Sequence, residues 1–275
     1  MDIYKYLDFI KAKEPLIYCM TNFVTVADMA QSITSIGARP LMANSYKESA
    51  DIAKFSNCLL INIGTLDDNQ KEGIISAYKS ALANNVPIVL DPVGVHATDY
   101  RKNFIKELLD LGSPTLIKGN ISEIKSLLNL STNFKGIDSL EKENSLIDDL
   151  ILTIKRYSSE KETIVVVTGK EDLVVFKDKA FCIKNGCSLM GKVTGTGCFL
   201  GAILGVFIAS VGKDNIEKFY SAINAVIFWG VCGEKAKSEL ENEKSIFTYK
   251  YKMLDNISIL NTEDLKERGR VYEKL

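Results

Sequence analysis

The sequence contains few of the residues that build metal and disulfide sites. Its 275 residues include one histidine, His96, and six cysteines that are scattered along the chain. No two cysteines have the Cys-x-x-Cys spacing that is typical of zinc sites and dithiol redox centres. A zinc site is therefore not expected. Because no signal for export is visible at the start of the sequence, we expect a cytoplasmic protein with reduced thiols.

An excess of one charge and a long apolar run are missing as well. The formal net charge is −1, and acidic and basic residues are mixed along the chain. No field would therefore draw the whole protein to nucleic acid or to an anionic membrane. The longest nearly uninterrupted apolar run, Phe199–Val211, is shorter than the roughly 20 residues of a membrane span and fits a buried helix. We expect neither a nucleic-acid partner nor a membrane anchor.

Short β-rich runs alternate with longer helical patterns over most of the chain. The expected strands are Leu16–Met20, Pro40–Ala43, Cys58–Ile63, Ile88–Leu90, Thr115–Ile117 and Ile164–Val167. The expected helices include Asn103–Leu111, Ile121–Leu128 and Ser139–Tyr157. Several of the strands are continuously apolar, as strands buried on both faces are. The alternation therefore predicts an α/β fold with a mostly parallel central sheet flanked by helices.

The pattern changes after Thr168. Leu173–Phe176 and Ala180–Lys184 predict a hairpin, which is followed by a glycine-rich turn and a helical half from Cys198 to about Lys237. The last stretch, Asn261–Lys274, is charged with a thin apolar stripe and predicts a surface helix. Because no repeat and no linker interrupts the sequence, we interpret residues 1–275 as a single domain.

The expected strands end in polar residues or glycine. Ligands bind beyond the carboxyl ends of the strands in open α/β sheets. The residues at these ends are Thr21-Asn22, Ala43-Asn44, Gly64-Thr65, Asp91-Pro92, Lys118-Gly119-Asn120 and Thr168-Gly169. They predict a ligand site along one edge of the sheet.

A glycine-rich turn at residues 193–198, Val-Thr-Gly-Thr-Gly-Cys, precedes the apolar helix. Glycines allow a tight turn and a close approach to a ligand, and a helix start presents free N–H groups and the positive end of the dipole. Together these features suit a phosphate. The turn alone could equally be one that only begins a helix. Neither the Gly-Lys-Ser/Thr phosphate loop nor the dinucleotide fingerprint is present, which argues against a dehydrogenase.

Two carboxylates at strand ends are candidates for a magnesium site. Asp91 follows the strand Ile88–Leu90, and Glu123 lies in the sequence Asn-Ile-Ser-Glu that begins at Asn120. Mg²⁺ prefers oxygen ligands and keeps several waters. Two structural readings stay open: Asn120 and Glu123 also match a helix capping box, and Asp91-Pro92 also matches a turn.

These motifs occur in an order that resembles the hydroxyethylthiazole kinase family of the ribokinase-like fold group. The matching segments are Thr21-Asn22-x-Val24-Thr25, Pro40-x-Met42-Ala43, Asn62-Ile63-Gly64-Thr65-Leu66, Asp91-Pro92-Val93-Gly94, Gly119-Asn120-x-x-Glu123, Val167-Thr168-Gly169 and Thr194-Gly195-x-Gly197-Cys198. The resemblance covers roughly residues 14 to 233. Each motif is weak alone, and the ordered set is specific.

The resemblance implies a three-layer ribokinase-like kinase that uses ATP and Mg²⁺ to phosphorylate the hydroxyl of 4-methyl-5-(2-hydroxyethyl)thiazole in thiamine salvage. It also implies a homotrimer with active sites between subunits. The expected site residues are Asn22, Met42 and Gly195 for the substrate, Lys118, Asn120 and Thr168 for ATP, Asp91 and Glu123 for the metal, and Cys198, Gly195 and Gly197 for catalysis. Cys198 stands where most ribokinase-like relatives carry a catalytic Asp. We interpret it as a group that aligns the substrate hydroxyl or weakly accepts its proton, because a thiolate beside phosphates is disfavoured.

Two departures from the family pattern stand out. Lys118 replaces the usual Arg before Gly-Asn, which keeps the charge and loses the planar fork. His96 stands where Gly is expected, and its plain interpretation is a solvated loop residue. The alternatives are a ribokinase-like kinase of hydroxymethylpyrimidine or pyridoxal, and a catalytically silent ligand-binding relative. Cys198 and Met42 argue against the first alternative.

Overall fold

The central strands are mostly apolar because helices cover both faces of the sheet. In β3 (Cys58–Asn62) all five residues are buried. Cys58 and Leu60 belong to one hydrophobic core, whereas Leu59 and Ile61 belong to the other. Successive side chains of a strand point to opposite faces, so a strand between two cores has no polar face. The computed structural model describes residues 2–130 and 140–274.

The described strands form one sheet with the order β2-β1-β3-β4-β5-β6-β7-β8-β9. The pairings from β2 through β6 are parallel, and those from β6 through β9 are antiparallel. Besides β3, the strands are β1 (Leu16–Met20), β2 (Arg39–Leu41), β4 (Ile88–Asp91), β5 (Leu116–Asn120), β6 (Ile164–Thr168), β7 (Asp172–Phe176), β8 (Lys179–Ile183) and β9 (Val271–Glu273).

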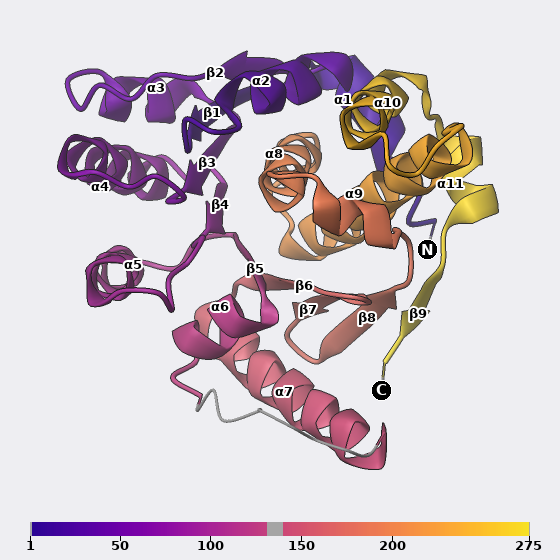
Figure 1. Ribbon diagram of the computed structural model, residues 1–275. Coiled ribbons are helices and arrows are strands. Elements are labelled where there is room, and N and C mark those ends of the chain that lie inside the picture. Colours follow the sequence, from indigo (N-terminus) through magenta and orange to yellow (C-terminus); the bar gives the residue numbers. More distant parts are fainter. Residues whose placement is uncertain (1, 131–139, 275) are drawn as a thin grey trace.

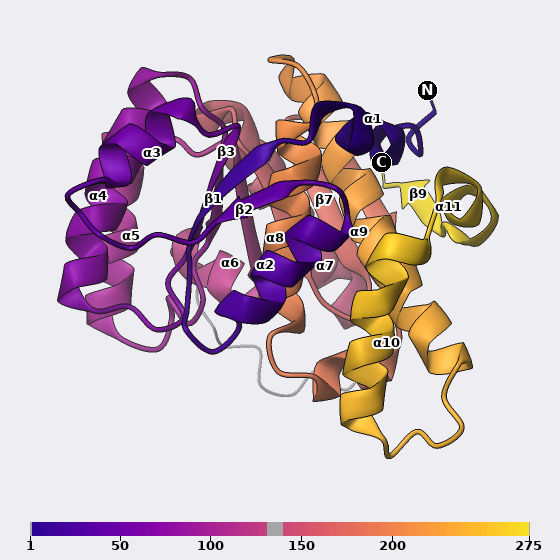
Figure 2. The same cartoon turned by 90° about the horizontal axis from the view of Figure 1, so that it is seen from above.

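The helices form two outer layers (Figures 1 and 2). One layer contains α3 (Ser49–Phe55), α4 (Asp68–Ala83), α5 (Asp99–Leu111), α6 (Ile121–Leu127) and α7 (Leu140–Lys161). The other contains α1 (Tyr6–Lys13), α2 (Val26–Ser35), α8 (Thr196–Ala209), α9 (Asn215–Ser238), α10 (Ile246–Ile259) and α11 (Thr262–Arg268). The predicted three-layer fold class is therefore confirmed.

Most of the expected elements are present with shifted ends. The predicted hairpin is formed by β7 and β8, with Lys177 in the left-handed region at φ 54°. The expected helical half after Cys198 consists of two helices, α8 and α9. The start of the helix expected at Ser139 lies outside the described residues. In the described part of the chain, no helix combines the length and apolar content needed to cross a membrane.

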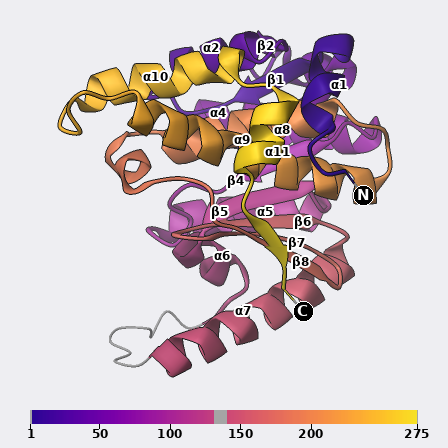
Figure 3. The same ribbon diagram turned by 90° about the vertical axis from the view of Figure 1, so that its right-hand side faces the viewer.

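Two predictions about local structure are wrong. Asn261–Lys274 is not one surface helix, because α11 ends at Arg268 and the chain continues as β9 along β8 (Figure 3). β8 would otherwise leave its outer backbone groups unpaired, and β9 supplies partners for them. The strand expected to end at Ile117 runs on to Asn120, so Lys118 lies inside β5 rather than in the loop after it. Its pairing with β6 extends the strand.

Candidate active site at the carboxyl edge of the sheet

A buried ion pair joins the ends of two neighbouring parallel strands. Lys118 Nζ lies 3.0 Å from Asp91 Oδ1 and 3.1 Å from Asp91 Oδ2. Asp91 is 0% exposed and Lys118 4%. The two side chains meet because β4 and β5 pair in parallel with Leu90 opposite Ile117, which places the next residues side by side. The pairing of the strands thus decides a contact between residues 27 positions apart.

The charges of this pair depend on each other. Burial raises the pKa of Asp91 to about 6, and Lys118 opposes that rise. Burial lowers the pKa of Lys118, but Asp91 and Glu123 outweigh burial and raise it overall. At neutral pH both groups are therefore ionised. A buried carboxylate with a single neighbouring cation is a functional-site candidate on physical grounds.

Cys198 lies in the first turn of α8 and is partly buried against this pair. Its sulfur accepts hydrogen bonds from Asn62 Nδ2 at 3.2 Å and from Asn22 Nδ2 at 3.4 Å. Burial and then the Asp91 carboxylate raise the pKa of the Cys198 thiol. The group is therefore a neutral thiol at neutral pH, which agrees with the aligning role expected from the sequence.

The glycine-rich turn brings the helix start next to this cluster. Gly195 is the N-cap residue of α8 and has φ +92°, a conformation that favours glycine. A Cβ atom on Gly195 would overlap the Thr25 side chain, and one on Gly197 would lie 3.1 Å from Lys118 Nζ. The missing side chain at Gly197 thus leaves the Lys118 ammonium group open toward the start of α8.

Replacing Gly195 by alanine is expected to destabilise the protein by about 1–3 kcal/mol, because alanine at this φ is strained and its Cβ overlaps Thr25. The distorted helix start should also lower turnover. Thermal unfolding and steady-state kinetics measure the two effects. Gly212→Ala is the matched control, because a Cβ there meets nothing within 4 Å. Equal unfolding temperatures and equal turnover for the two variants would contradict this account of the turn.

A pocket of about 920 Å³ adjoins the glycine-rich turn. Its walls include Asn120, Thr168, Gly195 and Gly197, all expected from the sequence as ATP or phosphoryl contacts. This volume is within the range of small-molecule and cofactor sites. Gly195, Thr196 and Gly197 at the start of α8 line this pocket, whereas Cys198 in the same first turn does not.

Glu123 is held in place by two backbone amides. Its Oε2 accepts from the N–H of Asn120 at 2.8 Å, and its Oε1 accepts from the N–H of Gly94 at 2.9 Å. Asn120 Oδ1 in turn accepts from the N–H of Glu123, which completes a capping box. The structural reading of this motif is confirmed. A role in metal binding stays a prediction, since each carboxylate oxygen keeps a second lone pair.

Asp91 and Glu123 carry oxygen donors of the kind that a hydrated magnesium ion prefers. Glu123 lies close enough to Asp91 to contribute to its raised pKa. Over residues 2–130 and 140–274, no group of three or more His, Cys, Asp or Glu could hold a metal ion. Two carboxylates without further protein ligands suit Mg²⁺, which keeps several waters and takes substrate phosphates as ligands.

The structure thus brings Asn22, Asp91, Lys118 and Cys198 into one cluster, with Glu123 at its border. Met42 directly follows β2 and packs against the core on the α8 side. Its contact with the substrate stays a prediction.

Three functional candidates were missed in the sequence. Asn62 joins Asp91 to Cys198, and its signals in the sequence were its place in one of the ordered motifs and at the polar end of an apolar strand. Asp172 lines the pocket and accepts from the N–H of Gly169 at 2.9 Å, and burial raises the pKa of Asp172 to about 6. Trp229, the one tryptophan of the chain, also lines the pocket and donates to the carbonyl oxygen of Thr196 at 3.1 Å.

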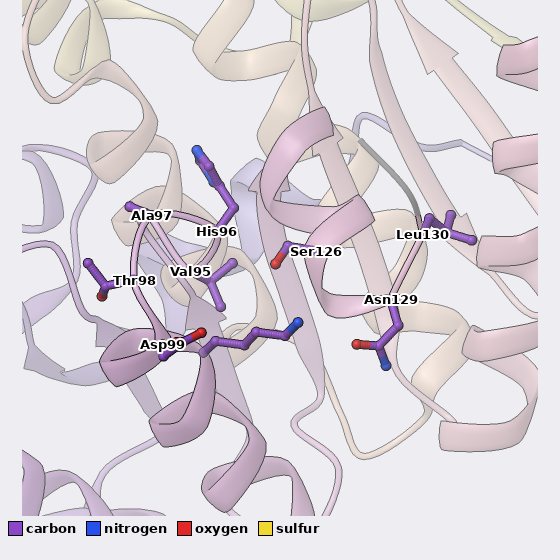
Figure 4. Close-up of a pocket in the computed structure, with 9 residues that line it drawn as sticks. Val95, His96, Ala97, Thr98, Asp99, Ser126, Asn129 and Leu130 are labelled. Atoms are coloured by element: carbon purple, nitrogen blue, oxygen red, sulfur yellow. The ribbon is translucent and has the colours of Figure 1, made fainter. Parts of the chain in front are cut away.

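A second hollow lies between the loop after β4 and the end of α6 (Figure 4). His96 and Thr98 line one side, and Ser126 and Asn129 line the other. His96 is exposed, so its interpretation as a solvated loop residue is confirmed.

A parallel sheet with this carboxyl-edge cluster, a glycine-rich helix start and a neighbouring pocket defines the ribokinase-like class of small-molecule kinases. Solved structures of that class share the fold. The ADP complex of Bacillus subtilis pyridoxal kinase has a TM-score of 0.58 at 15% identity, over 81% of this chain and 93% of the other. At this identity the similarity concerns the fold alone.

The chain belongs to the hydroxyethylthiazole kinase family, whose model matches residues 7–263. The hydroxyethylthiazole kinase of Clostridium perfringens (strain ATCC 13124) is 42% identical over 265 residues, which cover 96% of this chain and 99% of that protein. The structure of hydroxyethylthiazole kinase from Pyrococcus horikoshii OT3 has a TM-score of 0.86 at 30% identity and covers 99% of both chains. The family suggested by the ordered motifs is therefore confirmed.

Proposed function

We propose that this protein transfers the terminal phosphoryl group of ATP to the hydroxyl of 4-methyl-5-(2-hydroxyethyl)thiazole, in a Mg²⁺-dependent reaction of thiamine salvage. Family membership supports the substrate. The observation that carries the proposal is the start of α8, where Gly195 and Gly197 line the pocket and Cys198 lies beside the Asp91–Lys118 pair. We further propose that residues 1–275 act as one cytoplasmic kinase domain. The six unpaired cysteines agree with a reducing compartment.

Phosphoryl transfer depends on positioning and charge neutralisation. The free N–H groups at the start of α8 would bind the transferring phosphoryl group. The Lys118 ammonium group has three donors, of which Asp91 takes two, so one remains for a phosphate oxygen beyond Gly197. Asp91 and Glu123 would hold Mg²⁺, which supplies charge neutralisation on the phosphates.

Cys198 would face the acceptor hydroxyl. Its thiol is neutral, because burial and the Asp91 carboxylate raise its pKa. It therefore aligns the hydroxyl by a hydrogen bond and assists proton removal only weakly. We place the thiazole next to Asn22, which contacts Cys198 directly, and near Met42, and we place the nucleotide in the pocket beside Asn120 and Thr168.

Purified protein incubated with Mg-ATP and a panel of thiazole, pyrimidine and pyridoxal alcohols is expected to form hydroxyethylthiazole phosphate, identified by mass. EDTA should abolish the product, and added Mg²⁺ should restore it. The proposal is wrong if ADP release does not depend on the thiazole, or if only a pyrimidine or pyridoxal is phosphorylated. Thiazole binding without any turnover would instead identify a silent relative.

We also propose a homotrimer in which a neighbouring chain completes each site. Phe23 and Val24 directly follow Asn22, and their side chains are 77% and 59% exposed. Covering such side chains typically contributes about 1.5–3 kcal/mol each.

Phe23→Ser is therefore expected to weaken assembly and turnover together, as measured by sedimentation velocity and kinetics. Phe55→Ser is the matched control, because Phe55 is 60% exposed at the end of α3. A monomer that is fully active at nanomolar concentration would contradict the proposed assembly.

A further inference from the structure

Asn62 is a fully buried amide at the end of an apolar strand. It is 0% exposed and follows four apolar residues in β3. Burying an amide is costly unless its hydrogen-bonding groups are all paired. Here all of them are paired, and their partners include two predicted site residues, Asp91 and Cys198.

The hydrogen bonds fix which way the amide points. Asn62 Oδ1 accepts from the N–H of Gly64 at 2.9 Å, and this backbone group can only donate. The Asn62 NH₂ group must therefore face the other side. There it donates to Asp91 Oδ2 at 2.9 Å and to Cys198 Sγ at 3.2 Å.

A second amide is oriented in the same way. Asn22 Oδ1 accepts from the N–H of Thr25 at 3.0 Å, so its NH₂ group faces Asn62 and Cys198. Asn22 Nδ2 donates to Asn62 Oδ1 at 3.0 Å and to Cys198 Sγ at 3.4 Å. Every N–H of both amides thus has a defined acceptor.

The Cys198 sulfur consequently has two N–H donors on its buried side. A thiol facing two donors cannot direct its own hydrogen at them, so the S–H group points away from both amides. Asp91 anchors Asn62, and Asn62 in turn sets the direction of the thiol. The hydrogen bonds therefore connect the Asp91 carboxylate, through Asn62, to the Cys198 thiol.

We propose that Asn62 is a positioning residue that orients the Cys198 thiol toward the acceptor alcohol. The identity of that alcohol rests on the proposed function, whereas the orientation of the thiol rests on the hydrogen bonds alone. The competing explanation is that Asn62 only ends β3, by accepting the N–H of Gly64.

Two substitutions separate these explanations. Asn62→Ala removes both donors, and Asn62→Asp keeps the size and the acceptor for Gly64 while placing an oxygen against Asp91 and Cys198. If Asn62 positions the thiol, both variants should lose about tenfold or more in kcat with little change in the KM for ATP. The kcat of Asn62→Asp should then be no higher than that of Asn62→Ala. If Asn62 only ends the strand, both variants should lower the unfolding temperature and leave kcat of the folded protein unchanged, and the proposal fails.

Asn256→Ala is the matched control for loss of a buried amide. Asn256 is also 0% exposed and donates to the carbonyl oxygen of Lys252 within α10. Its substitution should lower the unfolding temperature and leave kcat unchanged.

A second measurement needs no substrate. The pH dependence of iodoacetamide labelling of Cys198 is followed by mass spectrometry in the wild type and in Asn62→Ala. Because the Asn62 N–H favours the thiolate, its loss should move the labelling midpoint to higher pH.

An unchanged midpoint, or a shifted midpoint with wild-type kcat, overturns the positioning role. If the midpoint shifts and the wild type phosphorylates no thiazole, the proposed function fails and the positioning of the thiol stands.

Discussion

Lys118→Ala is expected to abolish most turnover and to destabilise the protein at the same time. The substitution leaves the Asp91 carboxylate at 0% exposure without its cation. Breaking a buried pair in this way typically costs about 3–5 kcal/mol. The loss of the ammonium group should also weaken the use of ATP more than the binding of thiazole, since charge-assisted bonds to phosphate are lost.

A double substitution separates the two effects. Asp91→Asn combined with Lys118→Met removes both charges and should recover most of the stability, because no unpaired charge remains buried. It should recover no turnover if the charges serve the reaction. Lys118→Arg keeps the cation and should be tolerated, since Arg adds a bidentate fork for phosphate.

The measurements are chemical unfolding, the KM for ATP and kcat. Lys266→Ala is the control for the loss of an exposed ion pair, because Lys266 lies 2.8 Å from Glu263 with both side chains exposed. Such pairs contribute at most about 1 kcal/mol. An unchanged KM for ATP and unchanged kcat in Lys118→Ala would remove Lys118 from the site.

Substitutions of Cys198 should distinguish alignment from covalent chemistry. If Cys198 only aligns the hydroxyl, Cys198→Ser should keep substantial activity, and Cys198→Asp should equal or exceed the wild type. A carboxylate at this position would receive the N–H groups of Asn22 and Asn62 and lie near Lys118. The unperturbed pKa of an aspartate side chain is about 3.9, against about 8.5 for a thiol. The carboxylate is therefore ionised at neutral pH and can accept the proton of the substrate hydroxyl.

The deciding values are the turnover numbers of the Ser, Asp and Ala variants at saturating thiazole and Mg-ATP. General-base assistance is worth about 10²–10⁴-fold. A loss of more than about 10⁴-fold in all three variants would exceed what a general base contributes and would rule out the aligning role. Alkylation of the thiol would not decide, because a bulky adduct blocks the site in either case.

Local sequence patterns predicted the fold class and much of the site. Continuous apolar strands indicated a sheet covered on both faces, and both hydrophobic cores confirm it. Gly195 has the positive φ that a turn before a helix requires. These features could be predicted because period, apolar content and glycine positions act within a few residues of each other.

The structure of the C-terminal segment could not be predicted from local sequence patterns. The same charged residues with a thin apolar stripe fit a helix or an edge strand, and β9 forms because β8 presents an unpaired edge. That edge is created by residues about 90 positions away in the chain, at Phe181 to Ile183.

The sequence by itself determined the family, the sheet between two helical layers and the types of side chain that meet at its carboxyl edge. Only the tertiary structure decided that Lys118 pairs with Asp91 and that Asn62 links Asp91 to Cys198. The physical reason is that these contacts depend on strand order and register. Parallel pairing of β3, β4 and β5 brings Asn62, Asp91 and Lys118 side by side, and the packing of α8 against β1, β3 and β4 places Cys198 against the two amides.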